Sequence, residues 1–344
     1  MSKVGIIANP ASGKDIRRLV AYGTVFDNQE KVSIVRRVLL ALAATGVEEV
    51  IYMPDYYGIV PKAADGIGSR HRLPMDIVCA DIELTGTQED SYQAALELQR
   101  SGVGCIITLG GDGTNRMVAK GCGEIPLLPI STGTNNVFPE MIEGTSAGLA
   151  AGVVAQGWVC DTPAIHPTKK LDIYLNGTPA DIALIDAVIL KDTFIGSRAV
   201  WDAERIRQVV VTRGEAHNIG ISSIAGVLEP VGIMEERGLV MEVEPGEANL
   251  LAPIAPGLVE PLRVRNYRHI ELNEEIKVKD VPCLIALDGE RELEVREGDE
   301  ATIKLTFEGP RVIDVRAALR QAALRGCFRG DAVTKLVRRL KEEA

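Results

Sequence analysis

Aromatic residues and long apolar runs are scarce in this sequence. Aromatic side chains make up 4% of the 344 residues, which argues against an aromatic-lined recognition surface. No stretch approaches the roughly 18 apolar residues of a membrane span, and the N-terminal residues lack the apolar core of a secretory signal. We therefore expect a cytoplasmic protein without integral membrane association.

Cysteine pairs, histidine clusters and excess positive charge are also missing. The six cysteines form no C-x-x-C pair and the four histidines share no metal-binding spacing, so we expect reduced thiols rather than disulfides or a zinc site. The formal net charge is -10. Proteins that bind nucleic acid or anionic lipid mainly by neutralising phosphates carry the opposite sign, so we expect small-molecule substrates and no nucleic acid.

Glycine, by contrast, is frequent. The 34 glycines indicate many tight turns and close backbone approaches, which favours phosphate-type ligands. With 46% hydrophobic and 25% charged residues, the composition is that of a globular protein. At about 150 residues per domain, the length predicts two domains.

The spacing of apolar residues changes along the chain. Up to about residue 157, apolar runs such as VGIIA and CIITL alternate with helix-period segments such as residues 31–45, which is typical of βαβ units around a parallel sheet. From about residue 168, segments such as ATIKLTF alternate apolar and polar residues, as half-buried antiparallel strands do.

These patterns predict an α/β fold with two domains and a C-terminal extension. Residues 1–160 are expected to form a Rossmann-like domain with a mostly parallel sheet, and residues 161–315 a β-rich, β-sandwich-like domain. Residues 316–344 are rich in arginine and lysine, and we expect a basic helical segment packed on the N-terminal domain.

The first candidate for chemistry is the loop NPASGK, which begins at Asn9 and has its glycine at Gly13. Backbone amides at such a strand-to-helix turn can hold a phosphate. A P-loop is excluded, because Ala8 stands where that motif has glycine and Asp15 where it has serine or threonine. An ordinary βα turn explains the same residues equally well.

The second and sharpest candidate is the glycine-rich loop GGDGTN after the run CIITL, which comprises Gly110, Gly111, Asp112, Gly113, Thr114 and Asn115. It is not a dinucleotide fingerprint, because Arg116 occupies the place of the last glycine. Glycines on both sides of Asp112 let the backbone approach a polyanion, while the carboxylate can accept a proton or hold Mg²⁺. A tight turn closed by an Asx hydrogen bond needs the same residues.

The third candidate is STGTNN, which follows the run LLPI and is predicted to open a helix. It supplies uncharged donors suited to a phosphate or a ribose, namely Ser131, Thr132, Gly133, Thr134, Asn135 and Asn136. Helix capping alone would explain some of them. Loops at the carboxyl ends of strands in one open sheet converge on one crevice, so we expect the three loops to meet.

Taken in this order, NPASGK, LGGDGTN and STGTNN resemble the superfamily that unites ATP-NAD kinases with diacylglycerol and sphingosine kinases. The later element LDGERE, with Asp288, Gly289 and Glu290, resembles the Asp-Gly-Glu element of the lipid-kinase branch. The runs GTNNVFPE, AGLAAG and IALIDAVIL look most like the acetoin catabolism protein X branch. The resemblance covers nearly the whole chain and is strongest from 104 to 139.

The resemblance implies that ATP and a substrate bind in the cleft between the two domains, with Mg²⁺. Asp112 corresponds to the general base of NAD kinases, whereas Glu290 corresponds to the base proposed for the lipid-kinase branch, so both are candidate catalytic residues. Asp288 is the candidate metal residue. The candidate nucleotide-binding residues are Asn9, Gly13, Gly110, Gly111, Gly113, Thr114, Gly133, Thr134, Asn135, Asn136 and Asp186.

Departures from NAD kinases concern the acceptor. The Asn-Glu pair that holds the adenosine part of NAD is replaced by Ile185 and Asp186, and the second-domain run rich in threonine and serine is reduced to ISSIAG. The predicted function is therefore phosphoryl transfer from ATP or polyphosphate to a hydroxyl of NAD or of a related small metabolite. The alternatives are a nucleotide-binding accessory protein without turnover and a lipid kinase. Homo-oligomers are common in the superfamily, so a homo-oligomer is a further expectation.

Overall fold

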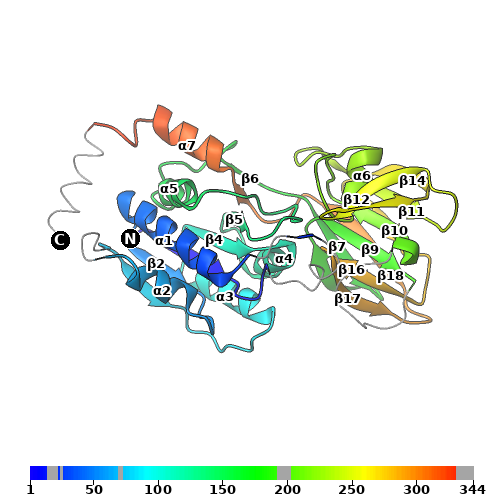
Figure 1. Cartoon of the computed structure of the whole chain (residues 1–344), viewed down its shortest axis with the longest axis horizontal. Helices are drawn as coiled ribbons and strands as arrows, with labels where there is room; N and C mark the ends of the chain where they lie inside the picture. Colours follow the sequence, from blue (N-terminus) through cyan, green and yellow to red (C-terminus); the bar gives the residue numbers. More distant parts are fainter. Residues whose placement is uncertain (14–21, 24–25, 69–72, 192–202, 331–344) are drawn as a thin grey trace.

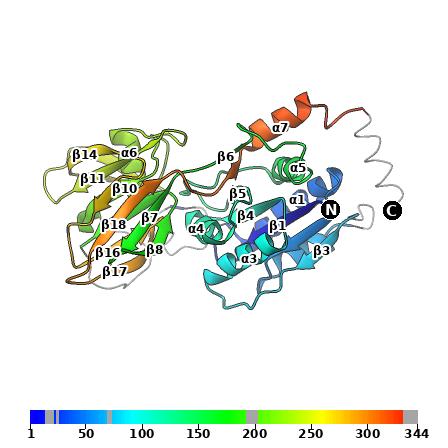
Figure 2. The ribbon, with the colours of Figure 1, turned by 180° about the vertical axis from the view of Figure 1, so that it is seen from behind.

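The computed structural model describes residues 1–13, 22–23, 26–68, 73–191 and 203–330. An α/β part and a β-rich part lie next to each other along the long axis of the molecule (Figures 1 and 2). This arrangement confirms the predicted α/β fold with a β-rich second domain. None of the described helices is long and apolar enough to cross a membrane.

The first sheet has the strand order β3-β2-β1-β4-β5-β19-β6. Neighbouring strands are parallel, except that β19 and β6 run antiparallel. The strands are β1 (Lys3–Ala8), β2 (Glu49–Tyr52), β3 (Asp76–Cys79), β4 (Cys105–Gly110), β5 (Leu127–Ser131), β6 (Ile165–His166) and β19 (Val312–Ile313).

Helices cover both faces of this sheet. One face packs on α1 (Asn28–Ala44), α2 (Ile59–Asp65), α5 (Gly144–Ala155) and α7 (Val315–Leu324). The other face packs on α3 (Glu89–Arg100) and α4 (Asp112–Gly121). Successive β1 residues belong to opposite cores, with Ile6 in the first and Ile7 in the second, because side chains alternate along a strand.

The helix predicted at residues 31–45 is confirmed as α1. Asp27 caps it, because its carboxylate accepts a hydrogen bond from the Glu30 amide at 2.8 Å. The apolar stripe of α1 packs against α5, where glycines permit a close approach. A Cβ on Gly148 would lie 2.7 Å from the Val38 carbonyl oxygen.

The second part is a β-sandwich of two antiparallel sheets. The larger sheet has the order β14-β11-β10-β9-β16-β17 and the smaller one β15-β18-β7-β8, with an apolar core between them. Their strands are β7 (Lys170–Leu175), β8 (Thr178–Ala183), β9 (Asp186–Leu190), β10 (Ile206–Val211), β11 (Arg237–Val243), β14 (Val264–Glu271), β15 (Glu275–Lys277), β16 (Cys283–Leu287), β17 (Glu290–Val295) and β18 (Ala301–Thr306).

A separate layer covers the outer face of the larger sheet. It consists of the helix α6 (Ser223–Leu228) and a two-stranded hairpin formed by β12 (Leu250–Ala255) and β13 (Leu258–Leu262). Prolines fall in this hairpin, outside the central ladders, as expected for a residue that cannot donate a ladder hydrogen bond. In the described part of the chain, the 3₁₀ turn η3 (Ala203–Arg205) directly precedes β10.

The chain returns to the first sheet after the sandwich. Strands β6 and β19 pair with each other beside β5, and α7 then packs on the core that contains α5. The sequence-based boundaries assign both strands to the second domain, whereas their hydrogen bonds lie in the first sheet. Of the basic segment predicted at 316–344, residues 331–344 lie outside the described residues.

The order of the first sheet determines where a ligand can bind. From β1 the chain builds outward to β2 and β3 on one side, and β4 and β5 lie on the other side. The loops after β1 and β4 therefore separate at the carboxyl edge of the sheet. In open α/β sheets, such a switch point is where ligands bind.

Candidate functional site

A cleft lies at this switch point and extends to the second domain. Its volume is about 640 Å³. Three loops of the first sheet line it, namely the first loop after β1 (residues 9–13), the second at the β4–α4 junction (110–115) and the third after β5 (132–136). The second domain contributes the turn at 288–290 and residues 219–222.

Hydrogen bonds tie the first loop to the other two loops. The Asn9 side chain donates through Nδ2 to Thr114 Oγ1 at 2.9 Å, and the Ser12 and Thr132 hydroxyl oxygens lie 3.0 Å apart. Gly13 has a φ of 76°, and a Cβ at this position would lie 2.7 Å from the Thr132 carbonyl oxygen, so glycine is required here. The three loops therefore meet as predicted, and direct contacts join them.

Glycines let the second loop turn directly from β4 into α4. A Cβ on Gly110 would lie 2.5 Å from the Thr114 Cβ, and a Cβ on Gly111 would lie 2.8 Å from Asn136 Oδ1. The helix begins at Asp112, so the amides of its first turn lie at the cleft. The positive end of the helix dipole favours an anion at this position.

The prediction that the third loop opens a helix is wrong. The chain stays irregular from 132 to 139, and α5 begins only at Gly144. Ser131 provides the physical reason, because its hydroxyl donates to the Gly133 carbonyl at 2.9 Å and accepts from Asn136 Nδ2 at 2.8 Å. These local hydrogen bonds satisfy polar groups in a turn rather than in a helix.

Asp112 lines the cleft and also fixes the segment after the third loop. Its Oδ1 accepts hydrogen bonds from the backbone amides of Val137 at 3.0 Å and Phe138 at 2.7 Å. Arg213 of the second domain donates to the Val137 carbonyl at 2.7 Å, and its guanidinium lies 5.4 Å from the centre of the Phe138 ring. Burial lowers the pKa of Arg213, and the Asp112 carboxylate counteracts this effect.

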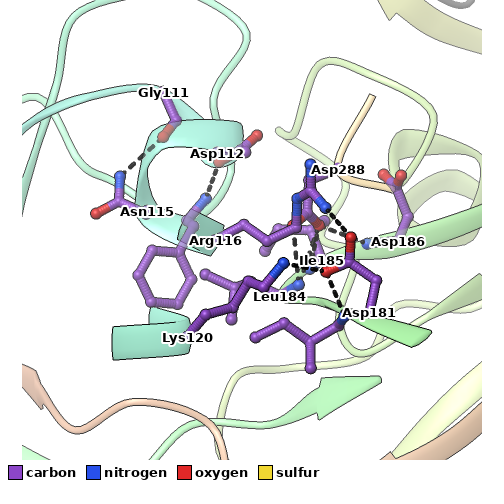
Figure 3. Close-up of polar contacts among 12 residues, drawn as sticks. Gly111, Asp112, Asn115, Arg116, Lys120, Asp181, Leu184, Ile185, Asp186 and Asp288 are labelled. Atoms are coloured by element: carbon purple, nitrogen blue, oxygen red, sulfur yellow. Dashed lines mark hydrogen bonds and ion pairs between the residues drawn. The ribbon is translucent and has the colours of Figure 1, made fainter. Parts of the chain in front are cut away.

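Asp288 organises the turn that faces the second loop. It has a φ of 50°, and its carboxylate accepts hydrogen bonds of 2.7 to 3.3 Å from the amides of residues 184–186 (Figure 3). Two residues later, Glu290 begins β17. A Cβ on Gly113 would lie 3.0 Å from Glu290 Oε1, so this carboxylate lies close to the start of α4.

Arg116 links the two domains behind the cleft. It lies on α4 one turn after Asp112 and its side chain is fully buried. Its Nη1 is 3.1 Å from Asp181 Oδ2 on β8, and its Nε is 3.8 Å from Asp288 Oδ2 (Figure 3). Lys120, one turn further along α4, lies 3.0 Å from Asp181 Oδ1.

The ionisation of Asp288 depends on two opposing effects. Burial of the carboxyl group raises the pKa of Asp288 to about 6. The neighbouring Arg116 charge and the backbone amides that donate to the carboxylate favour the ionised form and limit the rise.

Most of the candidate catalytic, metal and nucleotide-binding residues line one cleft, and two of them do not. The lining includes Asn9, Gly13, Gly111, Asp112, Gly113, Thr114, Gly133, Asn135, Asn136, Asp186, Asp288 and Glu290. Gly110 is buried at the end of β4 beneath Thr114, and Thr134 lies on the third loop outside the lining. The Asp186 carboxylate points away from Arg116 (Figure 3).

Three buried cations around the cleft were not predicted from the sequence, namely Lys31, Arg116 and Arg213. All three are at most 8% exposed. Arg116 could have been found as the residue one helical turn after Asp112, on the same face of α4. Lys31 and Arg213 carry no such signal, because the backbone carbonyls to which they donate lie far away in sequence.

The described residues do not form a metal cage. They contain no group of three or more histidine, cysteine, aspartate and glutamate side chains that could hold a metal ion. The Asp288 side chain is fully buried and accepts hydrogen bonds from backbone amides, and its role as a metal residue stays a prediction. Mg²⁺ often uses one or two carboxylates together with substrate phosphates, and Glu290 in the cleft fits such a shared site.

Comparisons with known proteins agree with this architecture. Residues 4–157 match the family model described as "ATP-NAD kinase N-terminal domain", and residues 169–308 match "Acetoin catabolism protein X C-terminal domain". Yeast NADH kinase complexed with NADH has the same fold, with a TM-score of 0.51 and 13% identity over 96% of this chain and 89% of that one. The fold is therefore of the kinase type found in NAD kinases.

The sequence relatives place the chain more narrowly. It is 42% identical over 329 residues to acetoin catabolism protein X of Cupriavidus necator, which covers 93% of this chain and 92% of the relative. It is also 26% identical over 224 residues to the NAD kinase of Thermoplasma volcanium, covering 62% of this chain and 75% of that protein. The chain belongs to the acetoin catabolism protein X family, and the predicted resemblance is confirmed.

Proposed function

We propose that this protein is a phosphotransferase that uses ATP, or polyphosphate, to phosphorylate a hydroxyl of NAD or of a related small metabolite. The observation that carries the proposal is a cleft at a topological switch point. Three loops joined by hydrogen bonds line it together with two carboxylates, those of Asp112 and Glu290. In phosphoryl transfer the protein mainly positions the reactants and neutralises charge, and this site provides the groups for both tasks.

The donor phosphates are proposed to bind against the first and second loops. Gly111 and Gly113 allow a phosphate to approach the backbone, and the first-turn amides of α4 supply donors without a bulk positive charge. This explains how a protein with a net charge of -10 can bind a polyanion. Asn135 and Asn136 on the third loop are proposed to contact the ribose.

Two carboxylates compete for the role of general base. The acceptor hydroxyl attacks the terminal phosphorus, its proton passes to a carboxylate, and the shortened donor leaves. We assign the proton to Asp112 first, because it lies at the start of α4 beside the proposed phosphate site. Glu290, near Gly113, is the alternative base and the proposed carboxylate for Mg²⁺, which would neutralise phosphate charge when bound.

The acceptor end of the proposed site differs from that of NAD kinases. Of the two residues that replace the Asn-Glu pair of NAD kinases, Ile185 packs in an apolar cluster with Phe138, and Asp186 lines the cleft. A single carboxylate can accept a hydrogen bond from one or two hydroxyls. Asp186 therefore favours an acceptor with hydroxyl groups. The experiment below tests NAD directly as the acceptor.

The experiment is a donor-and-acceptor panel with the purified protein. ATP and polyphosphate serve as donors with Mg²⁺, and NAD, small hydroxyketones and polyols, and detergent-dispersed diacylglycerol serve as acceptors. We expect a phosphorylated small-molecule product from the wild type. Because removal of a general base typically costs about 100- to 10,000-fold, we expect this loss in Asp112→Asn. A loss in Glu290→Gln that a higher Mg²⁺ concentration relieves indicates the metal role of Glu290, and a loss that Mg²⁺ does not relieve indicates that Glu290 is the base.

Three outcomes of the panel would overturn parts of the proposal. Product from diacylglycerol alone would identify a lipid kinase. ATP binding without any product would identify a nucleotide-binding accessory protein. Full activity of both variants would exclude these two carboxylates as the base.

A further inference from the structure

Lys31 lies directly beneath the first loop. It belongs to the first turn of α1, and its side chain is fully buried. Its ammonium group donates to the Asn9 and Ser12 carbonyl oxygens, both at 2.7 Å, and to Asn28 Oδ1 at 3.2 Å. One buried cation therefore holds two backbone carbonyls of a four-residue stretch of the proposed phosphate loop.

These contacts set the direction in which the loop presents its backbone. In a trans peptide, the carbonyl and the amide of the next residue point in opposite directions. When Lys31 draws the Ser12 carbonyl inward, the Gly13 amide is turned to the side away from Lys31, and Gly13 lines the cleft. The Asn9 carbonyl, which would repel a phosphate, is likewise held on the inner side.

Within the described part of the chain, the loop's other contacts act on only one of these two carbonyls, because the Ser12 hydroxyl donates to the Asn9 carbonyl at 2.8 Å. The Asn9 side chain is used by Thr114 and by the Ala11 amide, and the Ser12 hydroxyl contacts Thr132 and the Asn9 carbonyl. These side-chain bonds fix where the loop lies. Of the contacts described here, only those from Lys31 act on both carbonyls at once.

We propose that Lys31 is a positioning residue that gives the first loop its phosphate-binding conformation, and that it acts on the phosphate chain of the donor rather than on the acceptor. The proposal rests on the proposed function, because it needs a polyphosphate donor at the first loop. Lys31 does not touch the donor itself. It acts through the carbonyls of Asn9 and Ser12.

The second domain supplies a matched control. Lys169 is also buried, with 3% exposure, and its ammonium group donates to two backbone carbonyls, those of Gly232 at 3.0 Å and Arg237 at 2.8 Å. Neither Lys169 nor its two partners lines the cleft. Lys169→Met therefore removes the same kind of contact as Lys31→Met, with the same change of side chain, away from the first loop.

The test measures the binding of ATP with Mg²⁺ by calorimetry, together with the KM values for donor and acceptor. We expect Lys31→Met to weaken ATP binding about 10- to 100-fold, which corresponds to the loss of one to two charge-assisted hydrogen bonds. The acceptor KM should change less than 3-fold. Lys169→Met should bind ATP within 2-fold of the wild type, even where it lowers the unfolding temperature.

Asn28→Ala keeps the experiment decisive if Lys31→Met does not fold. It removes only the longest contact of the ammonium group, and we expect ATP binding to weaken 2- to 5-fold with a folded protein. Wild-type protein that binds neither ATP nor polyphosphate would refute the proposed function. Two results would refute the role of Lys31 and leave the proposed function standing. The first is ATP binding by the wild type that is unchanged in Lys31→Met or Asn28→Ala. The second is equal weakening of ATP binding in Lys31→Met and Lys169→Met.

Discussion

Replacement of Arg116 by methionine tests how the two domains are joined behind the cleft. The change removes a fully buried guanidinium that lies 3.1 Å from Asp181 and 3.8 Å from Asp288. Removal of one partner from a buried ion pair costs about 3–5 kcal/mol. We expect the lower end, about 3 kcal/mol, because Asp181 keeps Lys120 and Asp288 keeps its backbone amides.

The size and pH dependence of this loss can be measured by thermal unfolding. At roughly 2–4 °C per kcal/mol, Arg116→Met should lower the unfolding temperature by about 6–12 °C. The folded pKa of Asp288, about 6, lies above its unfolded value, so its contribution to stability falls as pH rises through 6. Without Arg116 this pKa rises further, and the variant should lose more stability at pH 8 than at pH 5.

A second substitution on the same helix provides the control for Arg116→Met. The Lys120 side chain is 31% exposed, so Lys120→Met should cost less than about 1 kcal/mol, with little dependence on pH. The reasoning is refuted if Arg116→Met costs no more than Lys120→Met. It is also refuted if the loss is the same at pH 5 and pH 8.

Two glycine substitutions separate activity from stability. In Gly113→Ala, the added Cβ would lie 3.0 Å from Glu290 Oε1. Because the Glu290 side chain is flexible, we expect a loss of activity with a change in unfolding temperature of only a few degrees. Unchanged kinetics would show that Glu290 does not lie at this position. In Gly148→Ala, the added Cβ would lie 2.7 Å from the Val38 carbonyl oxygen, where α5 packs on α1. We expect the free energy of unfolding, measured with denaturant, to fall by about 1–3 kcal/mol. An unchanged free energy would show that these two helices can move apart.

The fold was largely predictable because its signals are local. The apolar runs and helix-period segments before residue 157 correspond to strands and helices of the first sheet, and the capped helix α1 begins within three residues of its predicted start. Strands β6 and β19 escaped prediction, since each has two residues and is defined only by pairing across the chain. No periodicity can appear in so short a segment.

The site was predictable where glycine and small polar residues follow a strand. That pattern identified the three loops and the turn at 288–290, since the requirement for close backbone approach is visible in the sequence. It did not show that the Asp288 carboxylate accepts hydrogen bonds from the amides of residues 184–186. It also missed Lys31, whose carbonyl partners carry no side-chain signature.

The most direct test of the account is transfer of the terminal phosphoryl group of radiolabelled ATP to NAD or a small hydroxyl metabolite in the presence of Mg²⁺. We expect labelled product from the wild type, and a loss of about 100-fold or more in Asp112→Asn or Glu290→Gln. The proposed function would be contradicted by the absence of both labelled product and ATP binding in folded wild-type protein, with polyphosphate likewise inactive as donor.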